Sequence, residues 1–250
     1  MTVHFIGAGP GAADLLTLRG QRLIAESPVC VYAGALVPQT VIDHAPPGAR
    51  LIDTQHLELD AIISELQAAH DRGDDVARLQ SGDLSVYSAL AEQTRRLDQL
   101  SIPWDMTPGV PAFASVASAL NRELTVPGVA QTVILTRYGR RASPMPQGEA
   151  LAALATHGAT MVIHLGADAI EEIVEDLKPA YGPGCAVAVV ANASRAEEVI
   201  LRASLETVSA ELRAAGIRRA ATIVVGPALT ASEFQDSHLY SHVRERAVSP

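Results

Sequence analysis

The sequence has little of what several common kinds of protein depend on. Lysine occurs once, at Lys178, and the 250 residues carry a net charge of −9, which argues against a nucleic-acid-binding surface. No apolar run approaches the roughly 18 residues that a membrane-spanning helix needs. Neither a nucleophile elbow nor a phosphate loop ending in Gly-Lys-Ser or Gly-Lys-Thr is present. We therefore expect no nucleic-acid partner and no membrane partner.

The chain also has only two cysteines and lacks a recognisable targeting segment. Cys30 and Cys185 both lie in apolar, strand-like runs, so we expect buried thiols and no metal site. The first residues enter a strand directly, without the basic segment and apolar core of a signal peptide. Together with 48% hydrophobic and 19% charged residues, this predicts a soluble, cytoplasmic protein with a sizeable core.

Apolar runs alternate with amphipathic patterns along the chain, which is typical of an α/β protein. In the first half, the pattern predicts strands at 2–7, 28–33, 49–53, 76–81 and 104–108, and helices near 17–26, 39–44, 57–72, 85–100 and 112–122. In the second half, it predicts strands at 131–137, 160–165, 186–191, 198–203 and 221–226. A short polar loop joins the third and fourth of these, so they should pair as an antiparallel hairpin.

This order of elements predicts two domains and a tail. The N-terminal α/β domain covers residues 1–112 and has a mainly parallel sheet, and the C-terminal α/β domain covers residues 113–231 and has a mixed sheet. Residues 232–250 are polar and are expected to form a loosely held tail.

The most informative motif is a glycine turn directly after the first predicted strand. The segment from Val3 to Ala12 reads VHFIGAGPGA, so Gly7 and Gly9 stand in a tight turn between a strand and a helix. Glycine lets a ligand approach the bare backbone there, as in nucleotide and sulfonium cofactor sites. Pro10 has no N–H group, so the turn is a poor phosphate cradle. A nucleotide-like ligand without phosphate fits better, and a plain strand–helix turn is the alternative.

A dinucleotide cofactor would also need an acidic residue at the end of the second strand to hold the ribose hydroxyls. That strand and the residues after it read VCVYAG from Val29 to Gly34 and contain no carboxylate. The sequence therefore disfavours an NAD-dependent oxidoreductase and the common Rossmann-type methyltransferases.

Two further turns follow the fourth and fifth predicted strands. Ser81, Gly82 and Asp83 follow the fourth, where Gly82 allows close approach and Asp83 can accept from ribose hydroxyls or cap the next helix. Tyr87 is expected one turn into that helix, facing the same edge. The segment PGVPA at 108–112 follows the fifth strand as a rigid turn. Three ligand-compatible turns on one sheet edge favour a binding site over three unrelated caps.

The strand at 131–137 ends in a basic cluster inside an acidic protein. Arg137 is followed closely by Arg140 and Arg141, and such a cluster suits a ligand rich in carboxylates or phosphates. A solvated loop is the alternative interpretation of Arg140 and Arg141. His56 lies at a predicted loop-to-helix junction, where it can reach a cleft or remain a surface histidine.

These motifs resemble those of the tetrapyrrole methyltransferases. The shared features are GAGPG after the first strand, GD-x-x-x-Y after the fourth and PGV after the fifth, and the resemblance covers about residues 1–230. AGALVP at 33–38, HLE at 56–58 and QTVILTR at 131–137 look like one member that acts in cobalamin (corrin) biosynthesis. The chain departs from the family at Leu84, where proline is frequent, and at Ala12 and Ala13, where Asp-Pro is common.

The resemblance implies a two-domain α/β fold with the active site in the cleft between a mainly parallel N-terminal sheet and a mixed C-terminal sheet. It also implies a homodimer, a tetrapyrrole substrate, and S-adenosylmethionine as the methyl donor, which leaves S-adenosylhomocysteine. Methylation of another tetrapyrrole position remains an alternative, and so does a non-catalytic nucleotide-binding module.

The resemblance further implies roles for individual residues. The cofactor site would be lined by Gly9, Pro10, Ser81, Gly82, Asp83, Val86, Pro111, Ala112, Leu165 and Ala193. Arg137, Arg140 and Arg141 would meet the carboxylates of the macrocycle. Tyr87, His56 and Asp83 are the catalytic candidates, as a general base if proton loss accompanies methyl transfer.

Overall fold

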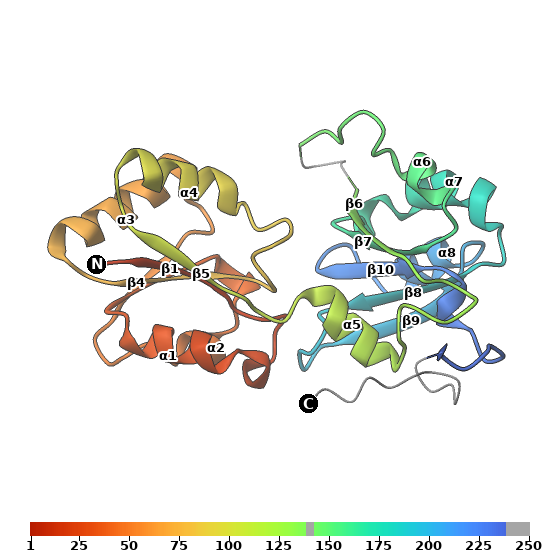
Figure 1. Cartoon of the computed structure of the whole chain (residues 1–250), viewed down its shortest axis with the longest axis horizontal. Helices are drawn as coiled ribbons and strands as arrows, with labels where there is room; N and C mark the ends of the chain where they lie inside the picture. The colour runs from red at the N-terminus through yellow and green to blue at the C-terminus, as the bar shows by residue number, and fades with distance from the viewer. Residues whose placement is uncertain (139–142, 239–250) are drawn as a thin grey trace, which may run out of the picture. The chain divides into compact units, whose positions relative to one another are not determined.

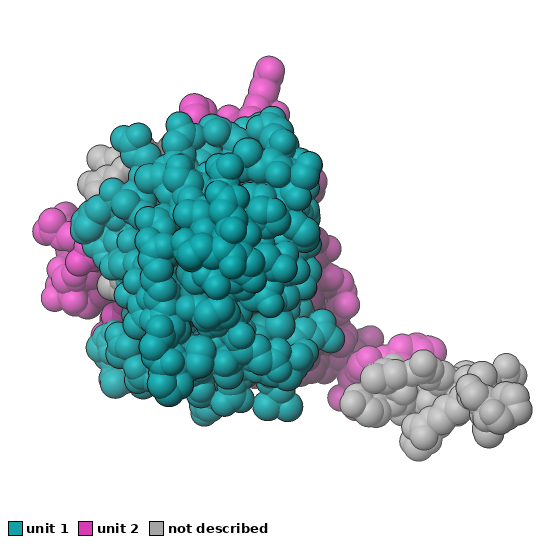
Figure 2. Space-filling view, turned by 90° about the vertical axis from the view of Figure 1, so that its left-hand side faces the viewer, with its two compact units in different colours: residues 1–115, 193–197 teal, residues 116–192, 198–250 magenta. Residues whose placement is uncertain are grey.

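The computed structural model describes residues 1–138 and 143–238, which form two compact units drawn in Figure 1 and coloured separately in Figure 2. Unit 1 comprises residues 1–115 and 193–197, and unit 2 comprises residues 116–192 together with the chain from 198 onward. The predicted domain boundary between residues 112 and 113 stays a prediction. Arg140 and Arg141 lie outside the described residues, as does most of the predicted tail.

Unit 1 is built on a five-stranded sheet of order β3-β2-β4-β1-β5. Its strands are β1 (Val3–Gly7), β2 (Val29–Tyr32), β3 (Arg50–Asp53), β4 (Val76–Gln80) and β5 (Trp104–Thr107). All four neighbouring pairs are parallel, which confirms the predicted mainly parallel sheet. Because β4, β1 and β5 are neighbours, the turns that follow them lie together at one edge of the sheet.

Helices cover both faces of this sheet. They are α1 (Leu18–Glu26), α2 (Gln39–Ile42), α3 (Leu59–Arg72) and α4 (Leu90–Gln99). Val3 and Phe5 of β1 pack on the face covered by α3 and α4, whereas Ile6 packs with α1 and α2 (Figure 1). A strand buried on both faces is apolar at successive positions, as β1 is at Phe5 and Ile6.

The helix predicted at 85–100 begins five residues late, which corrects the placement of Tyr87. Asp83 and Ser88 hold the chain before α4 in turns through local hydrogen bonds. Tyr87 and Ala89 have φ values of +55° and +53°, which are incompatible with a continuous helix. Tyr87 therefore stands in an irregular loop and not one turn into the helix.

Unit 2 contains a mixed sheet of order β6-β7-β10-β8-β9, as predicted. Its strands are β6 (Val133–Arg137), β7 (Thr160–His164), β8 (Ala186–Ala191), β9 (Val199–Ser204) and β10 (Ala221–Val225). The β6–β7 pair is parallel, the other pairs are antiparallel, and β8 and β9 form the expected hairpin. The strands β6, β7 and β8 thus run in one direction, and their carboxyl ends share an edge with the first residues of β9 and β10.

The helix α5 (Ala112–Leu120) leads from unit 1 into unit 2. The helices α6 (Leu151–Ala155), α7 (Ile170–Tyr181) and α8 (Val208–Ala214) were not placed from the sequence. Their apolar residues share one core with β7, β8 and β10, which includes the fully buried Met161, Ile173 and Leu212. Short 3-10 helices occupy Ala13–Leu15 (η1), Gly34–Leu36 (η2), Ala167–Ala169 (η3) and Pro227–Leu229 (η4).

The two thiols are free and differ in burial. Cys30 is buried in β2, as expected, but Cys185 is only half-buried because it lies in the turn before β8 begins. Within the described ranges, none of the helices has both the length and the apolar composition needed to cross a bilayer.

Candidate functional site

Three glycines bring the turns of unit 1 into backbone contact, and we name them the glycine cradle: Gly7, Gly82 and Gly109. A Cβ atom on Gly7 would lie 2.5 Å from Gly109 N. One on Gly109 would lie 2.7 Å from Gly7 O and closer still to Gly82 O. Real Cβ atoms do not approach other atoms within 3.0 Å, so the turns can meet only because side chains are absent. The meeting of the three turns at one sheet edge agrees with the predicted strand order, whereas the approach of a ligand to them stays a prediction.

Three N–H groups in and just after the GAGPG turn are already engaged within the protein. Ala8 N donates to the last carbonyl of β4 (2.7 Å), Gly9 N donates to a carbonyl of the cradle (3.1 Å), and Ala12 N donates to Ser194 Oγ (3.0 Å). Pro10 has no N–H group. A phosphate would need free N–H groups at such a turn. The turn therefore fits a ligand that meets the backbone by close packing and carries no phosphate.

Asp83 clamps two of these turns together. Its Oδ1 accepts hydrogen bonds from Ser85 N (2.9 Å) and from the Ser85 hydroxyl, and its Oδ2 accepts from Gly109 N (2.9 Å). Partial burial raises the pKa of Asp83, but the hydrogen bonds from Ser85, Gly109 and Leu84 outweigh it and hold the pKa below its ordinary value. Both carboxylate oxygens serve the loop structure, and a carboxylate of low pKa is a weak base.

A buried arginine in unit 1 connects the loops that carry His56 and Tyr87. Arg78, in β4, is 3% exposed; its Nε donates to Gln93 Oε1 (3.0 Å) and its Nη1 to Thr54 Oγ1 (3.3 Å). Gln93 donates in turn to the backbone at which α4 begins (2.7 Å), and Thr54 donates to the end of β2 (3.0 Å). Burial lowers the pKa of Arg78 to about 10, so the group stays charged at neutral pH.

His56 and Tyr87, two of the catalytic candidates, are both exposed beside this network. His56 lies between β3 and α3, two residues after Thr54. Tyr87 is 45% exposed and precedes α4. Arg78 was not among the sequence-predicted candidates, although an arginine between the apolar residues of a buried strand is a usable signal.

The tip of the β8–β9 hairpin packs with unit 1. The stem of Arg195 covers Gly11, because a Cβ there would lie 2.5 Å from Arg195 Cγ, and Arg195 Nη2 donates to Leu36 O (2.9 Å). Ser194, in the same tip, accepts from Ala12, which is 182 positions away in the chain. Ala193 of the same tip is assigned to the cofactor by resemblance only, and no local pattern could have revealed a contact over that separation.

Most residues assigned to the cofactor by resemblance lie in unit 1. Those are Gly9, Pro10, Ser81, Gly82, Asp83, Val86, Pro111, Ala112 and Ala193. Gly9 and Pro10 are buried in the GAGPG turn, and Ala112 begins α5. Leu165 belongs to unit 2, where it follows β7, is 59% exposed and has a φ of +55°.

Arg137 ends β6 at the carboxyl edge of the unit 2 sheet. Its Nη2 donates to Ser143 O (2.7 Å), while its Nη1 is buried and has no hydrogen-bond partner in the described parts of the chain. Strand register places Arg137 beside His164, whose pKa is lowered by burial, so the imidazole is neutral at pH 7. A charged donor without a partner at a strand end is suited to bind a carboxylate.

The unit 1 edge also has a side-chain hydrogen-bond donor that a ligand can use. Gln80 is 7% exposed at the end of β4, and its Nε2 atom is buried without a partner among the described residues. It is therefore a donor still available to a ligand. Among residues 1–138 and 143–238, no group of three or more His, Cys, Asp or Glu side chains is arranged to hold a metal ion. A compact cradle, engaged backbone N–H groups and one free amide together fit an adenosine-type ligand without phosphate.

Comparisons with known proteins extend this interpretation. The family model described as Tetrapyrrole (Corrin/Porphyrin) Methylases matches residues 2–209. A precorrin-4 C(11)-methyltransferase from Rhodococcus erythropolis is 54% identical over 246 residues, which are 98% of this chain and 99% of the relative.

Solved structures agree with the observed fold. A cobalt precorrin-4 methyltransferase is similar with a TM-score of 0.89 and 33% identity, over 92% of this chain and 96% of that one. A uroporphyrin-III C-methyltransferase from Thermus thermophilus, solved in complex with S-adenosylhomocysteine, has a TM-score of 0.76 and 26% identity, over 92% and 99% of the two chains. The parallel sheet and the mixed sheet described above are therefore those of solved tetrapyrrole methyltransferases.

Proposed function

We propose that this chain, which belongs to the tetrapyrrole (corrin/porphyrin) methylase family, transfers a methyl group from S-adenosylmethionine to ring carbon 11 of precorrin-4. The products are precorrin-5 and S-adenosylhomocysteine, and the reaction is a step of cobalamin biosynthesis. The observation that carries the proposal is the 54% identity to a precorrin-4 C(11)-methyltransferase along nearly the whole of both chains.

The comparisons also favour a macrocycle without cobalt. The Rhodococcus relative is named for precorrin-4 itself and is 54% identical, whereas the solved cobalt precorrin-4 methyltransferase is 33% identical. Methylation of another ring position has weaker support, because the uroporphyrin-III enzyme is 26% identical.

The glycine cradle and the GAGPG turn support the assignment of the cofactor. S-adenosylmethionine, when bound, supplies a methyl group that its sulfonium activates for displacement. It carries no phosphate, which agrees with the engaged N–H groups of Ala8, Gly9 and Ala12. We assign its binding to Gly9, Pro10, Ser81, Gly82, Asp83, Val86, Pro111, Ala112, Leu165 and Ala193.

The chain's main contribution to the rate is positioning. Holding two reactants in the correct orientation can lower a barrier by about 7–11 kcal/mol. Asp83 fixes the turn after β4 against Gly109, and Arg78 fixes the loops on either side. We assign Asp83 to positioning because its carboxylate is already hydrogen-bonded, and we propose His56 or Tyr87 as the base that removes a ring proton.

The substrate carries many acetate and propionate groups, so cationic side chains are needed to hold it. We assign this role to Arg137, whose buried Nη1 has a free hydrogen-bonding position in the described structure, together with Arg140 and Arg141. The net charge of −9 would otherwise repel such a polyanion.

We also propose that the enzyme is a cytoplasmic homodimer. The two free thiols fit a reducing compartment, and the homodimer rests on the family resemblance. Light scattering at micromolar concentration should give twice the mass of the 26.3 kDa chain. A mass of one chain would contradict the dimer.

The activity is tested by incubating the protein with precorrin-4 and S-adenosylmethionine carrying a ¹³C-labelled methyl group. Mass spectrometry should show one added methyl group, and carbon NMR should place the label on ring carbon 11. Label on another carbon would support the alternative ring position. Tight binding of S-adenosylhomocysteine with no transfer to any precorrin would support a non-catalytic binding module.

A further inference from the structure

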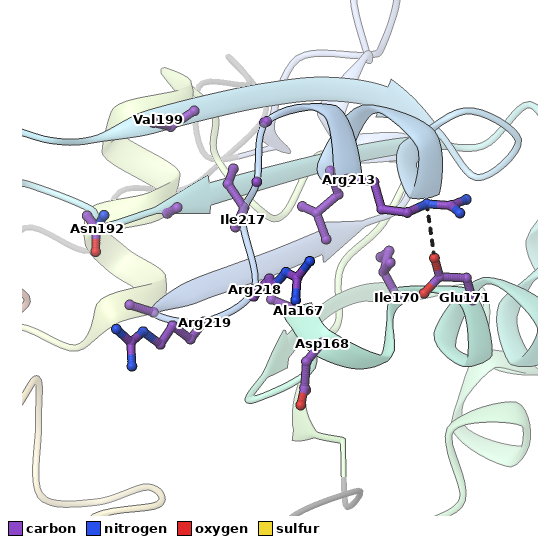
Figure 3. Close-up of a pocket in the computed structure, with 15 residues that line it drawn as sticks. Ala167, Asp168, Ile170, Glu171, Asn192, Val199, Arg213, Ile217, Arg218 and Arg219 are labelled. Carbon is purple, nitrogen blue, oxygen red and sulfur yellow. Dashed lines mark ion pairs between the residues drawn. The ribbon is translucent and has the colours of Figure 1, made fainter.

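A large pocket in unit 2 has no part in the function proposed so far. Its volume is about 1010 Å³, and it lies where β7 and β8 end and where β9 and β10 begin (Figure 3). Pockets that hold small ligands usually measure roughly 300–1,000 Å³. This one is therefore large enough for a substantial part of a macrocycle.

The lining of this pocket carries more positive than negative charge. Three arginines, Arg213, Arg218 and Arg219, stand against two acids, Asp168 and Glu171. Arg213 Nε lies 3.3 Å from Glu171 Oε1, so that pair is neutralised (the dashed line in Figure 3).

Arg218 and Arg219 differ from Arg213 because they form no ion pair with a described residue. Both are exposed, and in the described chain neither has an ion pair or a side-chain hydrogen bond. They extend from the loop between α8 and β10, Arg218 on the side of Ala167 and Arg219 on the side of Asn192 (Figure 3). A loop in an acidic protein thus offers two free guanidinium groups to the pocket.

The chain connects this pocket closely to residues already assigned to the cofactor. Leu165 comes two positions before Ala167, and Ala193 comes directly after Asn192. Ala167 and Asn192 both line the pocket. The pocket also opens at the same edge of the sheet as Arg137, which ends β6.

We propose that Arg218 and Arg219 bind carboxylate side chains of the tetrapyrrole in this pocket, an inference that rests on the proposed function for its class of ligand. A guanidinium binds a carboxylate through two parallel N–H···O hydrogen bonds, which fix orientation as well as affinity. Together with Arg137 this gives the macrocycle two separate attachment points. One point alone would let a ring with similar substituents rotate, whereas two select which ring carbon faces the methyl donor.

The test compares Arg218→Gln/Arg219→Gln with a control of equal charge change, Arg19→Gln/Arg95→Gln. Arg19 and Arg95 are exposed on α1 and α4 and, like the pocket pair, make no ion pair within the described residues. We expect the pocket variant to raise KM for precorrin-4 at least about tenfold, since a hydrogen bond to a charged group is of that strength. It should also place some of the methyl label on a different ring carbon. Binding of S-adenosylhomocysteine should stay unchanged, and Arg213→Gln should have a smaller effect than the pocket variant.

A direct binding measurement separates this inference from the proposed reaction. Uroporphyrin, a porphyrin polycarboxylate, is titrated into each protein and followed by its fluorescence. Weaker binding by the pocket variant than by the control supports the pocket even if the wild-type protein fails to methylate precorrin-4. Equal affinity for uroporphyrin in both variants, or an unchanged KM with an active wild type, would overturn the inference.

Discussion

The sheet edges of unit 1 and unit 2 differ in the chemical groups that they offer to a ligand. In unit 1, the edge is made of backbone: Gly7, Gly82 and Gly109 lack side chains where the turns meet. Its hydrogen-bonding groups are largely satisfied within the protein. In unit 2, the edge carries long cationic side chains: among the described residues, Nη1 of Arg137 and the guanidinium groups of Arg218 and Arg219 have no partner.

This difference matches the chemistry of the two ligands that the proposed reaction brings together. A compact adenosine-type ligand is selected by shape, and shape is set most sharply by backbone that cannot move aside. A flexible polycarboxylate is selected by charge, and long arginine side chains can follow it. The backbone edge should therefore tolerate no added atoms, whereas the cationic edge should respond to charge and salt.

The largest effect should follow from filling the backbone edge. Gly109→Ala places a Cβ against the backbone of Gly7 and Gly82, none of which is the end of a flexible side chain. Ordinary overpacking costs about 1–3 kcal/mol, and we expect a loss at or above the top of that range, with binding of S-adenosylhomocysteine abolished. Urea unfolding and calorimetry measure the two effects.

Gly184→Ala is the matched control, because a Cβ on Gly184 meets no atom within 4 Å. It should unfold and bind like the wild type. If Gly109→Ala also behaved like the wild type, the tight meeting of the three turns would not be a property of the protein.

A smaller effect is expected from opening the Asp83 clamp. Asp83→Ala removes the acceptor of Gly109 N and Ser85 N, and hydrogen bonds to charged groups contribute about 1.5–3 kcal/mol. Because Asp83 is partly exposed, we expect a stability loss in the lower half of that range. Affinity for S-adenosylhomocysteine should fall as well, since the turn loses its fixed position.

The hydrogen bonds of Asp83 also predict that its contribution to stability falls at low pH. The folded pKa of Asp83 lies below its ordinary value of 3.8, so its contribution to stability is present above that pH and is lost as the pH falls through the folded pKa. The stability difference between wild type and Asp83→Asn should therefore shrink as the pH falls from about 6 to about 2. A difference that stays constant over this window would show that the ionised carboxylate is not the stabilising form.

Much of the fold could be predicted because the strands are apolar runs separated by strong turn signals. All ten predicted strands are present, and the change from parallel to mixed pairing was correctly anticipated from the short loop at 192–198. The start of α4 was wrong because Asp83 and Ser85 bond to each other locally and hold the chain in a turn. Helix periodicity in the sequence does not register that competition.

The site could be predicted only in part, for a related reason. Gly7 ends β1, and Gly82 and Gly109 follow β4 and β5, so the parallel order of these strands predicts that the three turns meet at one edge. Arg78, Ser194, Arg218 and Arg219 were missed because their roles depend on tertiary contacts or on a pocket between distant segments. Residues assigned by resemblance, such as Leu165, stay predictions.

The cationic edge should show a charge-dependent effect without loss of the fold. Arg137→Gln removes the guanidinium whose Nη1 has no partner in the described parts of the chain, so we expect KM for precorrin-4 to rise about tenfold at low salt and by less as salt increases. Affinity for S-adenosylhomocysteine should remain close to wild type. Arg137→Lys keeps the charge but loses the planar fork, and it should recover part of the lost affinity. A loss of cofactor binding with an unchanged KM for precorrin-4 would instead mean that Arg137 contributes to the cofactor site and not to the substrate site.

The smallest effect should come from the hairpin tip, which belongs by contact to the backbone edge of unit 1. Ser194→Ala removes the acceptor of Ala12 N, and a neutral hydrogen bond contributes about 0.5–1.5 kcal/mol. Because Ala12 is only half-buried, water can replace part of this bond, and we expect a loss in the lower half of that range. Affinity for S-adenosylhomocysteine should fall a few-fold, measured by calorimetry, because the GAGPG turn is then held less firmly. Glu197→Gln alters an exposed residue of the same tip and should change neither quantity. Equal behaviour of the two variants would mean that the tip covers the turn without supporting it.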